Sequence, residues 1–388
     1  MKLRLSLVLL LISSLCFAQE AEQKQKKFTM KGYLKDMASF NWYGDSLLFQ
    51  NLIHNRLNFA GYLNKEFTVV AELRSRIITG DFVQRVPGYD RLIDSNNDYF
   101  DLSINAGNSS TILNIMADRF YVQWTKNNWE IKAGRQRINW GVNLAWNPND
   151  WFNAYSFFDF DYEERPGSDA IRISRYTGVA SSIEVAAKMA ETTDQFVGAA
   201  MWKFNKKNYD WQFMAGFAQG DLALGSGWAG NLGLASFKGE LSYFHKTVNT
   251  TVNAGYNDMF LGAVSVDYSF ANSLYLNGSV MFNSLGKLNP DFGLLVVGQR
   301  PNSVRSLSPY KWSSFVQTSY PVSPLINSGI ALIYYPGGDS FFINPSITFS
   351  ARQNLDIDLI GQLFFGNNAA GNFASLINSL YVRLKWSF

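Results

Sequence analysis

The chain has 388 residues, of which 47% are hydrophobic, 16% aromatic and 17% charged, and its formal net charge is +3 at pH 7. The near-balance of 34 basic and 31 acidic residues gives no support for nucleic acid binding. The single cysteine, Cys16, excludes a disulfide framework and a cysteine-based metal site.

The first 18 residues have the organisation of a secretory signal peptide. Lys2 and Arg4 precede an apolar run of 11 residues, 5–15, and small residues then lead to a cleavage position after Ala18. The run is shorter than the roughly 20 residues that a transmembrane helix needs. We expect cleavage there, which would remove two basic residues and leave a net charge of +1.

Two further expectations concern this end of the chain. A lipid anchor on Cys16 is an alternative, but Leu15 directly before it fits a lipoprotein signal poorly. Residues 19–27 are few and polar, so we expect a disordered periplasmic tail rather than a plug. Residues 28–388 then form one domain.

After residue 18 the recurring pattern is period-two alternation, which predicts strands with two different faces. In residues 274–283, Leu274, Leu276, Val280 and Phe282 alternate with residues such as Asn277. Residues 56–63, 67–76 and 355–364 alternate in the same way. No later apolar run approaches the length of a helical span, so helical membrane spans are excluded.

Short polar turns alternate with long connections along the chain, a pattern typical of a membrane barrel. The short turns are 64–66, 126–128, 206–208, 271–273 and 352–354, and the long connections are 80–118, 139–167, 285–309 and 366–377. This spacing predicts an all-β, transmembrane, antiparallel up-and-down barrel of about 18 strands. Short periplasmic turns and long extracellular loops would connect them. Sixteen strands also fit, because the strands near 228–237 and 310–320 are ambiguous.

The alternative fold is a soluble sandwich, jelly roll or propeller. Four features favour the barrel: one long meander, 16% aromatics suited to interfacial girdles, 17% charge and almost no helical pattern. A closed barrel also pairs every backbone group, which lipid cannot do for an open sheet edge. The apolar face of each strand would then contact lipid, and the polar face would line a water-filled lumen.

The predicted luminal face carries more basic than acidic side chains. Arginine and lysine rings favour anions in a pore, although a mixed set of charges would also simply keep the lumen hydrated. The residues that we expect on the basic wall of a constriction are Arg56, Arg74, Arg76, Arg135, Arg137 and Arg172.

Two of these arginines depend on a change of phase. Strict alternation from Trp129 would point Arg135 and Arg137 into lipid, at a cost of about 2–4 kcal/mol at mid-bilayer. A bulge at Gly134 would turn both inward. Alternatively, both lie above the hydrocarbon band.

The long connection 139–167 is the candidate constriction. We expect it to fold into the lumen and to place an acidic arm opposite the wall arginines, which would set a transverse field. The arm consists of Asp159, Asp161, Glu163 and Glu164. The ring faces of its aromatics would stack on sugars; these residues are Trp140, Trp146, Trp151 and Tyr155. The alternative is a surface loop whose rings lie in the interfacial belt.

The last strand alternates apolar and polar residues and ends on Phe388, which resembles the terminal strand of bacterial outer-membrane barrels. The stretch 134–167, with Arg-Gln, Asn-Trp-Gly and Asn-Pro-x-Asp, is similar to poorly characterised porin-like barrels. This resemblance to the outer-membrane porin-type family implies passive transport, contact with outer-membrane lipid and recognition of Phe388 by the barrel-assembly machinery. A homotrimer and a monomer both fit an apolar outer face.

The leading hypothesis is therefore an outer-membrane porin for passive diffusion of small hydrophilic solutes, with an anion or saccharide preference. A structural or partner-binding barrel is the alternative. A barrel hydrolase is a third reading. The absence of a serine in a local catalytic motif with His54 or His245 argues against it, so it would need a histidine to pair with a serine distant in the sequence. We expect no cofactor and no metal: the calcium-loop-like start at Asp94 has Tyr99 in place of glycine and Asn105 in place of glutamate.

Overall fold

The computed structural model describes residues 27–86, 88–93, 98–155, 157, 160–161, 163–165, 167–286, 303–367 and 371–388. The predicted signal peptide and residues 19–26 of the predicted tail lie outside the described residues, as does Asp159 of the acidic arm. Among the residues that are described, no helix is long and apolar enough to cross a membrane.

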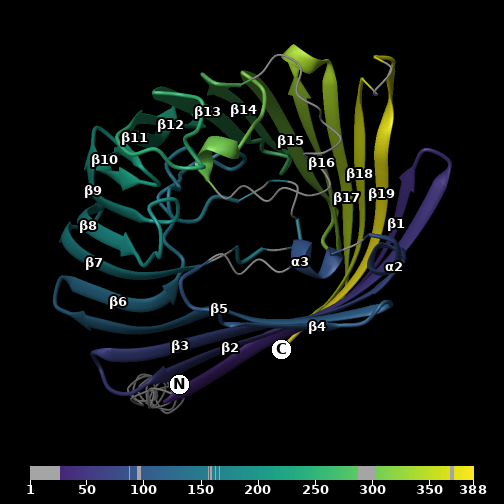
Figure 1. The fold of residues 1–388 in the computed structure, drawn as a ribbon, viewed down its shortest axis with the longest axis horizontal. Coiled ribbons are helices and arrows are strands. Elements are labelled where there is room, and N and C mark those ends of the chain that lie inside the picture. Colours follow the sequence, from purple (N-terminus) through teal and green to yellow (C-terminus); the bar gives the residue numbers. More distant parts are fainter. Residues whose placement is uncertain are drawn as a thin grey trace, which may run out of the picture.

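In the described parts of the chain, nineteen antiparallel strands form one sheet, and eighteen of them close into a ring (Figure 1). The ring closes because the first strand pairs with both the second and the last. The strands are β1 (Phe28–Tyr43), β2 (Ser46–Tyr62), β3 (Phe67–Gly80), β4 (Ser103–Gly107), β5 (Thr111–Lys126), β6 (Trp129–Gln136), β7 (Ser168–Gly178), β8 (Ser181–Lys188), β9 (Val197–Lys206), β10 (Tyr209–Ala218), β11 (Asp221–Leu232), β12 (Ala235–Lys246), β13 (Asp258–Ser269), β14 (Tyr275–Asn283), β15 (Trp312–Ser323), β16 (Ile326–Tyr335), β17 (Ser340–Arg352), β18 (Leu355–Asn367) and β19 (Phe373–Ser387).

The prediction of an all-β barrel of about 18 strands is confirmed. The ambiguous stretch 228–237 contains a turn at Gly233, whose φ of 65° favours glycine, so it belongs to two strands rather than one. The strand β4 lies outside the ring order: it pairs with β5 at Ile112–Met116, beyond the point where the short β6 ends. The helical pieces are α2 (Asp81–Arg85), α3 (Tyr89–Ile93), η2 (Val304–Ser306) and η3 (Pro336–Gly338).

The two ends of the barrel differ in their connections. The start of β1, the end of β19 and the short turns lie at one end, where residues 127–128, 179–180 and 207–208 each join two strands. The connections 81–110, 137–167 and 284–311 leave and rejoin the strands at the opposite end. The expected arrangement of short turns and long loops is therefore present, although tight turns also occur at the loop end, at 44–45 and 219–220.

The outer face of the barrel is apolar, as the alternation predicts. A strand turns successive side chains to opposite faces, so one apolar set points outward on each strand. Exposed outward residues include Leu34, Ile53, Ile77, Val122, Ile171, Val185, Phe213, Leu224, Val264, Val280, Val316, Ile330, Ile347, Leu359 and Val382.

The inner face is not polar on every strand, which corrects the expectation from the sequence. On β9 to β18, many inward side chains are buried apolar residues that belong to one hydrophobic cluster. The cluster includes Met201, Met214, Phe244, Leu261, Met281, Phe315, Ile333, Phe342 and Phe364, together with aromatic residues of the connection 137–167. On these strands the alternation separates two apolar faces, one against lipid and one against this connection.

The register contains a bulge at a position that the sequence does not reveal. Glu72 of β3 pairs with Arg119 of β5, but Leu73 pairs with Ala117, so Asp118 is the extra residue. Asp118 and Arg119 are consequently both buried, although they are neighbours in a strand. The bulge expected at Gly134 is wrong, because β6 keeps a continuous register with β5 and β7.

Gly134 nevertheless changes the direction of the chain. Its φ is +118°, and a Cβ there would lie 2.3 Å from the carbonyl oxygen of Phe120. Arg135 and Gln136 are both buried directly after it. Arg135 therefore avoids lipid without a bulge.

Candidate functional site

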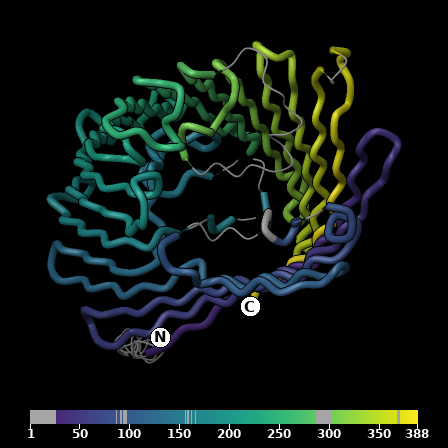
Figure 2. Tube along the Cα trace, viewed as in Figure 1, coloured from purple at the N-terminus to yellow at the C-terminus, as the bar shows by residue number. Residues whose placement is uncertain are grey.

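The connection 137–167 crosses the interior of the barrel and is the candidate functional site. Its described residues contact inward-facing side chains of β8, β10, β12 and β13 and the backbone of β11 on one side. On the other side they contact side chains of β1, β2 and β19. Figure 2 shows parts of this connection passing through the ring of strands. Two separate sets of contacts hold it. The contacts of residues 140–151 with the barrel wall form one set, which we call the apolar anchor. The contacts of the acidic arm form the other.

The apolar anchor is centred on Glu240 of β12, which has no exposed surface. Its Oε1 accepts hydrogen bonds from the backbone N–H groups of Val142 (2.6 Å) and Asn143 (2.9 Å). The Nδ2 of Asn143 donates to the same oxygen at 3.1 Å. Oε2 accepts from the backbone N–H of Asn149 at 2.9 Å. Among the described residues, no lysine or arginine forms a salt bridge with this carboxylate.

Aromatic rings complete the apolar anchor. Trp140, Trp146 and Trp151 are only 3–4% exposed. Trp151 lies 5.9 Å from the ring of Phe244 and donates its indole N–H to Ser242 at 3.0 Å, while Trp140 donates to Glu184.

The expectation that these rings stack on solutes is wrong, because packed side chains cover them. The interfacial-belt alternative fails for the same reason. The fourth ring, Tyr155, is covered by the guanidinium of Arg165, 3.0 Å from the ring centroid.

The acidic arm contacts the strands at which the barrel closes. Asp161 accepts hydrogen bonds from Lys35 at 3.2 Å and Arg383 at 3.2 Å, and it lies 2.9 Å from Nδ1 of His54. Burial alone would raise the pKa of Asp161, but the hydrogen bond with His54 and the charge of Lys35 outweigh burial and hold the pKa below its usual range.

Glu163 is the more exposed member of the arm, at 43%. It pairs with Lys35 at 3.2 Å and with Lys385 at 3.0 Å. Burial opposes ionisation here too, yet Lys35 and Lys385 lower its pKa. Asp161 and Glu163 are therefore ionised at neutral pH.

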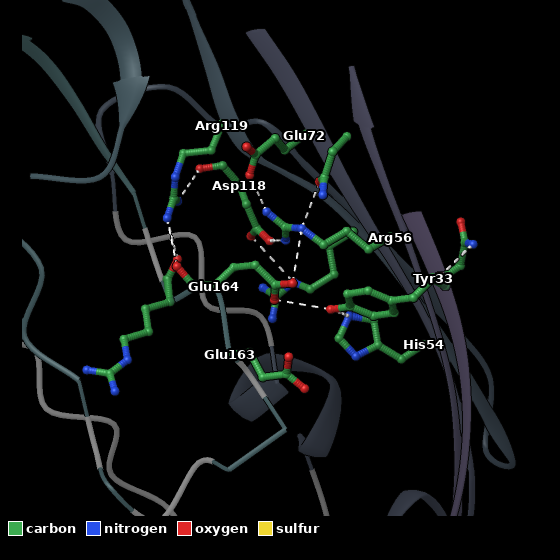
Figure 3. Close-up of polar contacts among 12 residues, drawn as sticks. Tyr33, His54, Arg56, Glu72, Asp118, Arg119, Glu163 and Glu164 are labelled. Atoms are coloured by element: carbon green, nitrogen blue, oxygen red, sulfur yellow. Dashed lines mark hydrogen bonds and ion pairs between the residues drawn. The ribbon is translucent and has the colours of Figure 1, made fainter. Parts of the chain in front are cut away.

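Glu164 joins the arm to Arg56, whose side chain has no exposed surface (Figure 3). It accepts a hydrogen bond from Tyr33 at 3.1 Å and lies 3.5 Å from Nε of Arg56. Arg56 also pairs with Glu72 at 2.5 Å and with Asp118. Three carboxylates therefore surround this one guanidinium, and Arg74 approaches Asp118 at 3.4 Å from the next strand.

The other wall arginines have partners outside the described part of the arm. Arg76 donates to Asn114 at 2.8 Å, Arg135 pairs with Asp169 at 2.7 Å, and Arg172 pairs with Glu130 at 2.5 Å. Arg137 lies in the connection itself and donates to Asn139 at 3.2 Å. Among the described members of the arm, only Glu164 pairs with one of the six arginines, Arg56. The expectation that the arm faces all six stays a prediction, since Asp159 lies outside the described residues.

The true partners of the arm follow from closure of the ring. Lys35 is the register partner of His54 on one side and of Lys385 on the other. Residues 35, 54 and 385 are far apart in the sequence, so only the pairing of the first and last strands brings them together. The charges of Lys35, Arg383 and Lys385 are visible in the sequence as luminal, but their neighbourhood is not.

The site has no feature of a metal centre in its described part: no group of three or more histidine, cysteine or acidic residues could hold an ion. His54 lies between Asp161 and the hydroxyl of Tyr33, whose oxygen is 3.5 Å from Nε2. His245 lies 2.8 Å from Asp258 on an exposed surface. Both ring positions are explained by these neighbours.

Comparison with known proteins gives no family model and no curated protein that matches the chain. Solved structures do match. OpdK of Pseudomonas aeruginosa, solved with vanillate, has a TM-score of 0.59 at 9% identity and covers 94% of this chain and 99% of that one.

A second structure of OpdK, described as an outer membrane protein, has a TM-score of 0.57 at 9% identity, with 93% and 98% of the two chains covered. OccAB4 of Acinetobacter baumannii has a TM-score of 0.56 at 8% identity, with 95% and 99% covered. At these identities the likeness shows the fold, and the porin-type barrel fold expected from the sequence is confirmed.

Proposed function

We propose that the protein is an outer-membrane channel for passive diffusion of small hydrophilic solutes, narrowed by the connection 137–167. The observation that carries this proposal is a closed barrel, apolar outside, whose interior is crossed by a connection held on both sides. Eighteen strands enclose more space than strand side chains fill, so water occupies the remainder. A neighbour described as an outer membrane protein supports the location.

The charges along the interior favour weak rather than strong ion selectivity. Arg56 and Arg74 are compensated by Asp118 and Glu72, and Arg172 is compensated by Glu130. Rings of uncompensated cations would select anions strongly, but these cations carry their counter-charges beside them. We therefore propose only a slight preference for anions. The saccharide preference loses its support, because the tryptophans are buried.

Contacts with the outer-membrane lipid and with the assembly machinery belong to the same proposal. Phe388 exchanges two backbone hydrogen bonds of 2.9 Å with Gly32, and its ring is 40% exposed. An accessible terminal ring is what a receptor for the last strand would need.

Reconstitution of the purified protein into planar bilayers and vesicles tests the proposal. We expect stepwise conductance, a reversal potential near zero in a salt gradient, and vesicle swelling with small sugars and small carboxylates. Vanillate is a useful probe because one neighbour was solved with it. Heat-unfolded protein at equal concentration is the control. A folded, inserted barrel that neither conducts nor swells vesicles would overturn the proposal.

A further inference from the structure

Glu240 differs from every other carboxylate that holds the connection 137–167. The acidic arm is paired with lysine and arginine side chains, whereas Glu240 is bound by four N–H groups of the connection itself. Its two oxygens divide these donors: Oε1 takes those of residues 142 and 143, and Oε2 takes that of residue 149. One carboxylate thus fastens both ends of the segment 142–149.

Most surroundings of this segment are apolar. Many inward neighbours on the same wall belong to the hydrophobic cluster, including Phe244, Met259 and Leu261, and the polar Ser242 and Ser265 already bond to other groups of the connection. A buried N–H group without an acceptor is costly, and so is a buried carboxylate without donors. The N–H groups of the segment and the Glu240 carboxylate therefore stabilise each other only while the segment lies against β12. If the segment left the wall, the N–H groups and the carboxylate would both need hydrogen bonds with water.

We infer that Glu240 is the positioning residue that holds the segment 142–149 against the wall and so fixes the width of the passage; this inference rests on the proposed channel function. The Glu163 contact of the acidic arm is weaker than the Glu240 contact, because Glu163 is 43% exposed and salt screens exposed pairs. Neighbouring contacts point the same way: Asn149 donates to the backbone of Ser226 at 2.9 Å, and Ser265 donates to Asn143 at 2.6 Å.

The chemistry of the side chain predicts a graded series. Glu240→Gln keeps the shape but replaces one acceptor oxygen with an NH₂ group, which would face an N–H donor of the connection. Glu240→Ala removes both acceptors. Asp267→Asn is the matched control, because Asp267 is a luminal acid on the adjacent strand that pairs with Lys238 at 3.1 Å and lies outside this contact set.

Single-channel recording on the reconstituted full barrel tests the inference. We expect Glu240→Ala to raise conductance about two-fold or more and to admit larger solutes, because the bore then widens. Glu240→Gln should lie between, and Asp267→Asn should stay close to wild type. A Glu240→Ala barrel that is fully folded by heat-modifiable mobility and conducts as wild type would overturn the inference.

A disulfide supplies the rescue that a merely structural role would not show. The only natural cysteine is Cys16, so Asn143→Cys with Ser265→Cys adds one pair between the segment and β13. In the Glu240→Ala background, oxidation should restore wild-type conductance and reduction should raise it again. Equal conductance in both states would contradict the inference.

Amide hydrogen exchange separates this inference from the channel proposal, because it needs no conductance. Backbone amides 142, 143 and 149 should be protected in wild type and should exchange faster in Glu240→Ala, with β-strand amides unchanged. If wild type does not conduct but this difference appears, the channel proposal fails while the positioning role stands. If the amides exchange equally, the positioning role fails.

Discussion

Asp150 and Asp161 lie in the same connection and have opposite pKa shifts. Asp150 belongs to the apolar side of the interior, where burial raises its pKa to about 8 against the opposing charge of Arg137. Asp161 belongs to the charged side, where His54 and Lys35 hold its pKa below the usual range despite burial. The same functional group therefore prefers the neutral form on one side of the barrel and the ionised form on the other.

The difference shows that the interior has two walls with different roles. Strands β9 to β18 present mainly apolar residues, with a few ion pairs such as Lys238–Asp267, and hold the connection by packing, as a protein core does. Strands β1 to β8 and β19 present ion pairs, and the acidic arm adds its charges to theirs. The five predictions that follow test this contrast, from the largest effect to the smallest.

Removing the central cation of the charged wall should have the largest effect. Arg56→Met leaves Asp118, Glu72 and Glu164 without their shared partner, and breaking a buried ion pair costs about 3–5 kcal/mol. Denaturant unfolding in lipid vesicles measures it. Arg85→Met is the control, since Arg85 is exposed and pairs only with Asp81 of the same helix. Equal stability of the two variants would contradict the charged wall as described.

Removing a ring from the apolar wall should cost nearly as much. Trp151→Ala deletes a buried indole beside Phe244, and truncation of a buried aromatic side chain costs about 3–5 kcal/mol. The same unfolding measurement applies, with high salt as an added test. High salt should leave the effect of Trp151→Ala unchanged, because this variant removes no charge. Trp129→Ala, at an exposed outward position, serves as the control and should cost less.

The carboxyl of Asp150 should make stability depend on pH. Its folded pKa lies above its unfolded value, so the folded state holds a proton that the unfolded state releases, and stability falls as pH rises from about 4 to 8. Asp150→Asn should therefore stabilise the barrel at pH 9 by at least about 1 kcal/mol and change little at pH 4. The free energy of unfolding, measured at both pH values, tests this prediction. An equal effect at both would show that titration of Asp150 is not the cause.

Asp161→Asn is the counterpart of that variant. A depressed folded pKa adds stability above the usual carboxyl range, and this stability is lost as pH falls through the folded pKa. Asp161→Asn should therefore destabilise at pH 7 and converge on wild type in strong acid.

The smallest effect should come from the exposed rim of the acidic arm. Lys385→Gln removes one of the partners of Glu163, and pairs this exposed contribute about 0–1 kcal/mol. Unfolding should barely change. A loss of stability as large as that of Arg56→Met would mean that the acidic arm, rather than the apolar anchor, provides most of the attachment of the connection 137–167 to the barrel wall.

The parts of this molecule that depend on local sequence could be predicted, and those that depend on closure could not. Strand alternation and short turns such as 207–208 are local, so the barrel and its strand number follow from them. On β13, however, Met259, Leu261 and Ala263 point inward while Phe260 and Val264 point outward. When both faces of a strand are apolar, alternation cannot tell which face points into the barrel. The apolar wall and the burial of the tryptophans could therefore not be predicted from the sequence.

The arm partners and the bulge were hidden for related reasons. Lys35 meets Lys385 only because the first strand pairs with the last, which no spacing along the chain encodes. The sequence around Asp118 contains no local signal that predicts a bulge, so its role as the extra residue of the register could not be predicted. The role of Glu240 needs the position of the connection, which lies about 100 residues earlier in the chain.

The pairing of the acidic arm has a consequence for assembly. The cations that hold Asp161 and Glu163 come from β1 and β19, the two extremes of the chain. Before those strands meet, the arm has only part of its binding partners, and after they meet it bridges the joint between them. Binding of the acidic arm to its full set of partners therefore requires a closed barrel. A change that weakens these contacts also removes a bridge between β1 and β19, the two strands whose pairing closes the barrel.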